Sequence, residues 1–286
     1  MPRVTAPVFS VVIPAHQEEA VIAETLAFVA DLELGEAEVV VVANGCTDRT
    51  AERARAVPGV TVIDRPAPGK AGALREGDRA VTAFPRIYLD GDTRITATGL
   101  RALAAALTGP GAAEMAGLGV EFDTVGAARA VRRFYAVFAA MPHQQHGLVG
   151  RGHYALSAEG RARFEEFPEL TGDDLFVERS VPADRRAAVG GPRVLVRVPR
   201  TLGALVKVRT RTAFGNAQLA RAYAGDASYG SSTTASARSL PALVRSRPAT
   251  LPGVAVYVGV TVIARARAAR QHRRGEQRWE RDVTRR

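Results

Sequence analysis

The chain has 286 residues, 47% hydrophobic side chains and a net charge of +10, enough for one large α/β domain or one domain with an appendage. Its single cysteine, Cys46, excludes an internal disulfide framework and a cysteine-based zinc site. No apolar segment with a small-residue cleavage site follows Met1, so we expect no secretion signal and a cytoplasmic protein.

The basic excess is unevenly distributed along the chain. Residues 1–150 have 14 basic and 17 acidic side chains, a net charge of −3, whereas residues 151–264 have a net charge of +7 and residues 265–286 of +6. A basic surface on the second half suits phosphate groups, anionic lipid or nucleic acid as partners.

The first 110 residues alternate between short apolar runs and amphipathic segments. The β-branched runs at 8–14, 38–43, 60–63 and 86–89 predict buried strands. Helical spacing of apolar residues predicts helices between them, over 19–29, 48–57 and 70–83. This order predicts an α/β fold, with a mostly parallel, Rossmann-like sheet flanked by helices on both faces.

The second half is less regular. Its pattern predicts helices over 96–107, 127–141 and 201–223, another that begins near residue 173, and strands over 115–122, 148–157 and 194–198. The Ser, Thr, Gly and Ala residues of 226–238 predict a mobile loop.

The tail is predicted to form a helix from about Pro252, with an apolar start and an Arg-rich end. Its eleven apolar-leaning residues, 254–264, are fewer than the roughly 20 needed to span a bilayer. The helix either docks on the domain with a solvated basic end or lies on an anionic membrane surface.

Two aspartates separated by one glycine, Asp90-Gly91-Asp92, follow the predicted strand at 86–89. Ligands of an open α/β sheet bind at this edge, outside the carboxyl ends of the strands. Neighbouring carboxylates repel each other, and oxygen ligands suit Mg²⁺ or Mn²⁺ shared with substrate phosphates. We therefore interpret Asp90 and Asp92 as a metal–diphosphate site, with a solvated turn as the alternative.

A second acidic pair, Asp173 and Asp174, lies at a predicted helix N-terminus. Thr171 or Asp173 could cap that helix, which is the purely structural interpretation. After the first strand comes Pro14-Ala15-His16-Gln17-Glu18-Glu19 in place of Gly-x-Gly-x-x-Gly, which argues against a dinucleotide-binding enzyme.

Five short segments, taken in order, resemble glycosyltransferase family 2, which has the GT-A fold, over roughly residues 8–215. Each segment is weak alone, but all five follow the family's order on one βα framework. They are Ser10–Glu19, Val41–Asp48, Gly69–Leu74, Asp90–Asp92 and Gly172–Asp174.

The resemblance implies transfer of a sugar from a nucleotide diphosphate to an acceptor hydroxyl, usually with inversion, assisted by Mn²⁺ or Mg²⁺. The Gln-x-x-Arg-Trp motif and the membrane spans of processive synthases are missing, so we expect single transfers. The resemblance also implies a GT-A domain over 1–225, divided into a nucleotide half at 8–110 and an acceptor half at 111–225. A loop at 226–238 and a basic helical tail at 239–286 are expected to follow this domain.

The resemblance also assigns roles to residues. Asp92 is expected to bind the metal, with Asp90 on the metal or the donor ribose. Asp174 is expected to act as the base, with Asp173 either orienting it or exchanging roles with it. Ala43 occupies a position where the family usually has an acid, which leaves Asn44 for the base of the nucleotide. The expected donor contacts are Pro14, Glu18, Asn44, Asp48, Lys70, Asp90, Arg209 and Arg211.

The acceptor is expected over residues 143–154, where Gln144, His146, His153 and Tyr154 offer polar and aromatic contacts. A glycan, a lipid-linked compound or a small molecule fits equally well. Peripheral membrane contact through the tail stays open, and no nucleic acid is expected.

Two other classes remain as alternatives. A nucleotidyltransferase uses a similar sheet, but it typically has a Gly-rich loop after the first strand, and this chain has none there. A basic module that binds nucleic acid or a membrane surface would depend on the tail, which lacks the interleaved aromatic residues used to stack on bases.

Overall fold

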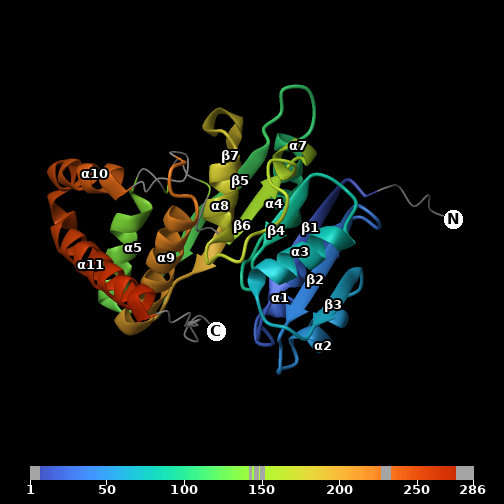
Figure 1. The fold of residues 1–286 in the computed structure, drawn as a ribbon, viewed down its shortest axis with the longest axis horizontal. Coiled ribbons are helices and arrows are strands. Elements are labelled where there is room, and N and C mark those ends of the chain that lie inside the picture. Colours follow the sequence, from blue (N-terminus) through green and yellow to red (C-terminus); the bar gives the residue numbers. More distant parts are fainter. Residues whose placement is uncertain (1–6, 142–143, 145–147, 149–151, 227–232, 275–286) are drawn as a thin grey trace. The chain divides into compact units, whose positions relative to one another are not determined.

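The computed structural model describes residues 7–141, 144, 148, 152–226 and 233–274, with the backbone alone for 233–238 (Figure 1). The chain forms two compact units. The sheet unit comprises Met1–Glu121, Leu148–Glu169 and Val177–Val196, and the helical unit comprises Phe122–Gly147, Leu170–Phe176 and Arg197–Arg286. Neither unit is continuous in sequence, because the chain passes from one unit to the other several times.

A seven-stranded mixed sheet, ordered β3-β2-β1-β4-β6-β5-β7, is the centre of the sheet unit. β1 lies between β2 and β4 and pairs with both in parallel, whereas β6 is antiparallel to β4 and β5. The strands are β1 (Phe9–Ala15), β2 (Ala37–Asn44), β3 (Val60–Arg65), β4 (Arg86–Leu89), β5 (Met115–Asp123), β6 (His153–Leu156) and β7 (Arg186–Arg197).

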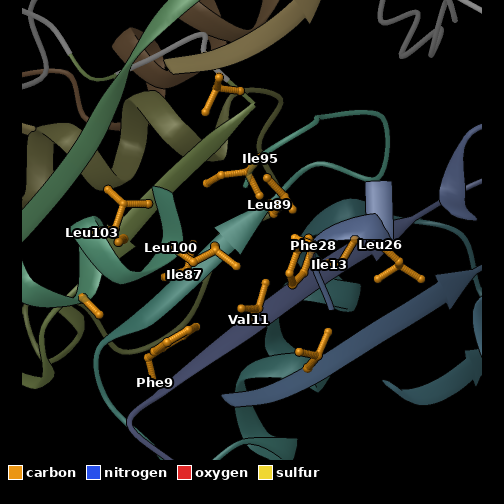
Figure 2. Close-up of a cluster of buried hydrophobic side chains, with 14 of the residues drawn as sticks. Phe9, Val11, Ile13, Leu26, Phe28, Ile87, Leu89, Ile95, Leu100 and Leu103 are labelled. Atoms are coloured by element: carbon orange, nitrogen blue, oxygen red, sulfur yellow. The ribbon is translucent and has the colours of Figure 1, made fainter. Parts of the chain in front are cut away.

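β1 is buried along its whole length, because helices cover both faces of the sheet around it. Phe9, Val11 and Ile13 alternate along one face and pack with Ile87 and Leu89 of β4 (Figure 2). Leu26 and Phe28, together with Leu100 and Leu103 of α4, complete this core. Successive side chains of β1 point to opposite faces of the sheet, so alternate residues pack against the helices on one face and the residues between them against the helices on the other.

Short helices follow the parallel strands, as βαβ units require. The predicted helix over 19–29 is instead one α turn followed by a 3₁₀ segment. The helical segments of this unit are α1 (Ile22–Thr25), η1 (Leu26–Asp31), α2 (Thr50–Arg55), α3 (Lys70–Ala80), α4 (Ala97–Ala106), α7 (Ala158–Arg161) and η2 (Ala183–Arg185), and α8 (Asp173–Ser180) has residues in both units.

The helical unit is built from α5 (Arg129–Ala139), α9 (Leu202–Ala222) and α11 (Leu251–Arg274), with α11 packed against both of the others. Phe134 and Phe138 of α5, Leu205 of α9 and Tyr257 of α11 share one apolar core. The tail is thus part of a folded unit, as the docking alternative expected.

Two further elements precede α11. α10 (Thr233–Ser246) begins inside the segment expected to be a loop, so that expectation was wrong from Thr233 onward. A 3₁₀ segment, η4 (Pro248–Thr250), then leads into α11. Pro248–Arg274 is long and apolar enough to cross a membrane by length and composition alone, so the eleven-residue estimate made from the sequence was too short.

Candidate active site

The first cluster of predicted site residues gathers at the carboxyl ends of β1, β2 and β4 in the sheet unit. Asp90 directly follows β4, and the ammonium nitrogen Nζ of Lys70 lies 2.7 Å from its Oδ1. Lys70 is the first residue of α3, where backbone N–H groups carry partial positive charge. The structure therefore brings together Lys70 and Asp90, both of which were expected to contact the donor.

The Asp90-Gly91-Asp92 turn is held by hydrogen bonds to distant parts of the chain. The amide N–H of Asp90 donates to the carbonyl of Gly152 (2.7 Å), and the Thr25 hydroxyl donates to the carbonyl of Gly91 (2.9 Å). A Cβ on Gly152, whose φ is +70°, would lie 2.1 Å from Thr93 Oγ1. Sequence reasoning missed Thr25 and Gly152 because their partners are about 60 residues away.

Gly91 separates the two aspartates for a steric reason. A Cβ there would lie 3.2 Å from Cγ of Glu18 and 3.3 Å from Cβ of Ala15. The loop after β1 therefore packs directly on the acidic turn, with Glu18 beside it. Asp92 itself is exposed.

Gln17 shapes the loop that follows β2. Its φ of +55° is unusual for a residue with a side chain. Its Oε1 accepts hydrogen bonds from the amides of Thr47 (2.8 Å) and Asp48 (3.1 Å), and its Nε2 donates to Thr47 Oγ1 (2.7 Å). This side chain thus ties the end of β1 to the start of the segment that leads into α2.

Asn44 and Asp48 were expected to contact the donor, but both side chains bind the protein itself. Asn44 is buried, its Nδ2 donates to the carbonyl of Ala15 (2.8 Å) and its Oδ1 accepts from the amide of Gly69 (3.0 Å). The carboxylate of Asp48 accepts from the amides of Glu19 (3.2 Å) and Thr50 (3.1 Å). Their hydrogen-bonding groups position loops, which corrects the expected base contact of Asn44.

Two other residues at this edge have limited chemical roles. Pro14 is buried within β1, beside Val42 of β2. Burial raises the pKa of the Cys46 thiol, which favours its protonated form.

The second cluster begins at the N-terminus of α8. Asp173 is buried, whereas Asp174 is only partly buried and its Oδ1 accepts from the amide of Leu175 (2.9 Å). Gly172 precedes them with a φ of +101°, and its carbonyl accepts from the amide of Phe176. Asp174 is therefore the more accessible of the two carboxylates.

Helix α9 supports the segment that carries these aspartates. The amide of Thr171 donates to Oε1 of Gln218 (2.9 Å), and a Cβ on Gly215 would lie 2.0 Å from the carbonyl oxygen of Thr171. Arg211 is one helical turn before Gly215, so it lies on the same face of α9. The structure thus places Arg211 on the α9 face that meets the loop before α8.

Arg209 lies elsewhere, and its expected phosphate contact needs correction. Its guanidinium carbon lies 4.9 Å from the ring centroid of Phe138 and 5.9 Å from that of Phe134. Burial lowers the pKa of this guanidinium. A side chain packed over aromatic rings in the core of the helical unit stabilises α5 against α9, which leaves Arg211 as the candidate for a donor phosphate.

The expected acceptor segment is described only in part. His143 and His146 lie outside the described residues, and the amide of Gln144 donates to the carbonyl of Met141. His153 is buried, with Nε2 accepting from the amide of Leu118 (2.9 Å), and the ring of Tyr154 stacks on Tyr88. His153 and Tyr154 are therefore core residues of the sheet unit. This agrees with the structural interpretation of His153 that the sequence favoured over a catalytic one, and it corrects the expected acceptor contacts of both residues.

Asp90 and Asp92 suit a hard divalent cation, because carboxylate oxygens at an accessible edge are the ligands that Mg²⁺ and Mn²⁺ prefer. Within the described part of the chain, no group of three or more His, Cys, Asp or Glu side chains gathers to hold a metal. Such a cation would therefore share its remaining positions with substrate oxygens or water, as Mg²⁺ commonly does.

Comparison with known proteins gives the same fold. A mannosyltransferase from Pyrobaculum calidifontis, in complex with GDP-Man and Mn²⁺, aligns over 96% of this chain and 89% of its own, with 20% identity and a TM-score of 0.63. Glucosyl-3-phosphoglycerate synthase from Mycobacterium tuberculosis, in complex with Mn²⁺ and UDP-Glc, aligns over 77% of this chain and 80% of its own, with 22% identity and a TM-score of 0.55. At these identities the likeness establishes the GT-A fold alone.

No curated protein sequence matches the chain significantly. Residues 10–158, just over half of the chain, match the family described as Glycosyl transferase family 2. The match covers the β1 loop, the Lys70 helix start and the Asp90-Gly91-Asp92 turn of the sheet unit. The chain therefore belongs to glycosyltransferase family 2.

Proposed function

We propose that the protein transfers one sugar at a time from a nucleotide diphosphate to an acceptor hydroxyl, with inversion and with a divalent cation. The observation that carries this proposal is the arrangement of Lys70, Asp90 and Asp92 at one edge of the sheet, with Lys70 Nζ 2.7 Å from Asp90. A positive helix start beside an exposed acidic turn can bind a diphosphate and its counter-cation at the same time.

The sheet unit binds the donor in this proposal. Asp92 binds the cation, and Asp90 binds either the cation or the donor ribose. Lys70 and the N-terminus of α3 attract the phosphates. A bound Mn²⁺ or Mg²⁺ would neutralise the negative charge that develops on the departing diphosphate.

The proposal gives the remaining roles to Arg211 and Asp174, as the family resemblance implies. Arg211 contacts donor phosphate oxygens, because a guanidinium binds them through two parallel hydrogen bonds. Asp174 accepts the proton of the acceptor hydroxyl, since it is the more accessible carboxylate at the start of α8. Asp173 orients it. Attack by that hydroxyl on the sugar face opposite the departing diphosphate gives inversion.

The acceptor class in this proposal is a compound with a free hydroxyl: a glycan, a lipid-linked compound or a small molecule. The acceptor contacts are not taken from His153 and Tyr154, which are buried in the sheet unit. A cytoplasmic location is part of the proposal.

The donor site is tested by a thermal-shift series with UDP, GDP and their sugars, with and without Mn²⁺. We expect one nucleotide to raise Tm by several degrees only when Mn²⁺ is present, because a ligand that binds the folded state stabilises it by mass action. Asp92→Ala should lose that increase, whereas Asp31→Ala, which removes an exposed carboxylate of the same unit, should keep it. A nucleotide shift that EDTA leaves unchanged would contradict the metal site.

A further inference from the structure

Helix α11 presents an apolar face that the described residues do not cover. Leu251, Ala255, Val258 and Val262 recur at i, i+4, i+7 and i+11, so they share one side of the helix. All four are exposed, and Ile263 is exposed beside them. Four of the eight large hydrophobic side chains exposed in the described part of the chain lie on this one helix: Leu251, Val258, Val262 and Ile263.

The opposite face of α11 explains why this helix is held in place. Gly253, Tyr257, Val260, Ala264 and Ala268 are buried. The ring of Tyr257 stacks on Phe134 of α5, with 5.2 Å between the centroids. The helix is thus firmly packed on one side and apolar on the other.

Charge accompanies the apolar face. From residue 239 to residue 274 the sequence contains no Asp or Glu, but it contains seven arginines. Arg267, Arg270 and Arg273, near the end of α11, are exposed, and within the described residues none of them forms an ion pair. Residues 239–274 therefore combine an apolar stripe with a basic end and contribute no carboxylate of their own.

We propose that this face of α11 binds the surface of an anionic lipid bilayer, with the apolar stripe below the headgroups and the arginines against their phosphates. This combination of an apolar face and basic side chains is what interfacial helices require. The proposal is independent of the sugar-transfer function, because it uses no residue of the donor or base clusters.

The helix lies on the membrane and does not cross it. Its buried face is occupied by α5 and α9, and these helices expose Arg129, Arg132, Arg133 and Lys207. A spanning α11 would either lose that packing or carry these charges into the hydrocarbon region, where a charged side chain costs several kcal/mol.

A second copy of the chain is a poorer occupant of the face. In a symmetric dimer that pairs the face with itself, residues 239–274 of neither copy would offer a carboxylate to the other copy's arginines. An anionic lipid surface supplies the opposite charge along the whole length of the stripe.

The test is sedimentation of the full chain with vesicles of phosphatidylcholine alone or with one-third phosphatidylglycerol. We expect at least tenfold tighter binding to the anionic vesicles, reduced by salt. Val258→Asp with Val262→Asp should weaken this binding at least tenfold. The control, Leu34→Asp with Val125→Asp, changes two apolar residues outside α11 that are more exposed than Val258 and Val262, and it should leave the binding unchanged.

The charge contribution is measured separately. Arg267→Gln, Arg270→Gln and Arg273→Gln together should weaken binding to anionic vesicles at least tenfold. The control replaces three exposed arginines of the sheet unit by Arg55→Gln, Arg79→Gln and Arg193→Gln, which gives a variant of the same net charge. This control should weaken the binding to anionic vesicles much less. Circular dichroism spectra and Tm values confirm that each variant is folded.

Three outcomes would overturn the proposal. The first is equal binding of the wild-type chain to both vesicle types, or binding to neither. The second is a dimer in solution that Val258→Asp dissociates, which would assign the face to a second copy. The third is retention in the membrane after alkaline carbonate washing, which would indicate a spanning helix. None of these measurements uses a nucleotide, so failure here leaves the donor-binding test unaffected.

Discussion

Glu38 of β2 shows how a single carboxylate joins distant segments of the sheet unit. Burial opposes its ionisation, but hydrogen bonds from the Ala83 amide, the Ser10 hydroxyl and the hydroxyl and amide of Thr82 outweigh burial and hold the pKa of Glu38 at about 2. The segment before β4 is thereby fixed to β1 and β2. The ionised form of Glu38 is the one that stabilises the fold.

The pH dependence of stability follows from that depressed pKa. Its contribution is present above the unfolded-state pKa of about 4.5 and is lost as pH falls toward 2. A shift of this size amounts to at most about 3 kcal/mol. Glu38→Gln should therefore lower the free energy of unfolding by about 2–3 kcal/mol at pH 7, measured by urea unfolding, and by much less at pH 2.5. Glu52→Gln, on an exposed position of α2, is the control, and an equal loss at both pH values would contradict this account.

Asp173 and Asp174 have different proposed roles, and single substitutions can separate them. Asp174→Asn should reduce kcat by at least about a hundredfold, because an amide cannot accept the acceptor proton, while the donor Kd stays unchanged. Asp184→Asn, which alters an exposed aspartate, should leave kcat unaffected. Measurable turnover by Asp174→Asn near the wild-type rate would remove Asp174 from the role of base.

The sequence indicated which residues lie at the site better than it indicated the role of each side chain. The sequence predicted that Lys70 and Asp90 belong to one site, since both follow from strand and helix ends. It did not predict that Asn44 and Asp48 use their side chains on backbone amides, or that Arg209 lies over Phe138. Those outcomes depend on tertiary neighbours, which no local pattern contains.

Helix α9 is the element on which the second cluster depends. Gly215 allows the carbonyl of Thr171 to approach so closely that any Cβ at position 215 would overlap it. Gly203 lies on the same helix with open space around its Cα. Gly215 is therefore needed for close packing, whereas a side chain at Gly203 would meet no neighbouring atom.

This difference gives a matched pair of variants. Gly215→Ala should displace the loop that carries Asp173 and Asp174 and reduce kcat at least tenfold with donor affinity retained, because the collision is with backbone. Gly203→Ala should keep kcat and raise the free energy of unfolding by about 0.5–1 kcal/mol, since alanine favours helix. Steady-state kinetics and urea unfolding measure both, and equal effects of the two substitutions would refute the packing role of Gly215.

Most elements were predictable, and the exceptions have physical causes. The β-branched runs gave β1, β2, β3 and β4 to within about two residues, because buried parallel strands are nearly continuous apolar segments. β7 starts eight residues earlier than expected. The sequence pattern predicted no strand before Val194 because Gly190, Gly191 and Pro192 lie there. α10 was missed because small polar residues do not identify a helix that tertiary packing stabilises.

At the scale of the whole molecule, the C-terminal region belongs to the core of the helical unit. Tyr257 and Val260 of α11 contact the same apolar cluster as Phe134 and Leu205. The sequence left open whether the tail docks or lies on a membrane; α11 packs with one face, and we propose membrane binding for the other.

Two neighbouring positions of α11 test this division. Tyr257→Ala should destabilise the chain by about 3–5 kcal/mol, the usual cost of removing a large buried aromatic side chain. Val258→Ala, one residue further on the exposed face, should change the free energy of unfolding by less than about 0.5 kcal/mol without lipid. Urea unfolding measures both, and a small effect of Tyr257→Ala would show that α11 is dispensable for folding.

The ion pair between Lys70 and Asp90 has a consequence for the order in which the proposed ligands join. The ammonium group already neutralises one carboxylate of the acidic turn, so an incoming cation competes with it for Asp90. Donor phosphate that draws Lys70 aside would relieve this competition, and each ligand would then raise the affinity for the other by the same factor. Lys70 would act as a resident counter-ion, exchanged when substrate arrives, and Lys70→Gln would remove this part of the coupling and leave the part that comes from direct contact between cation and phosphate.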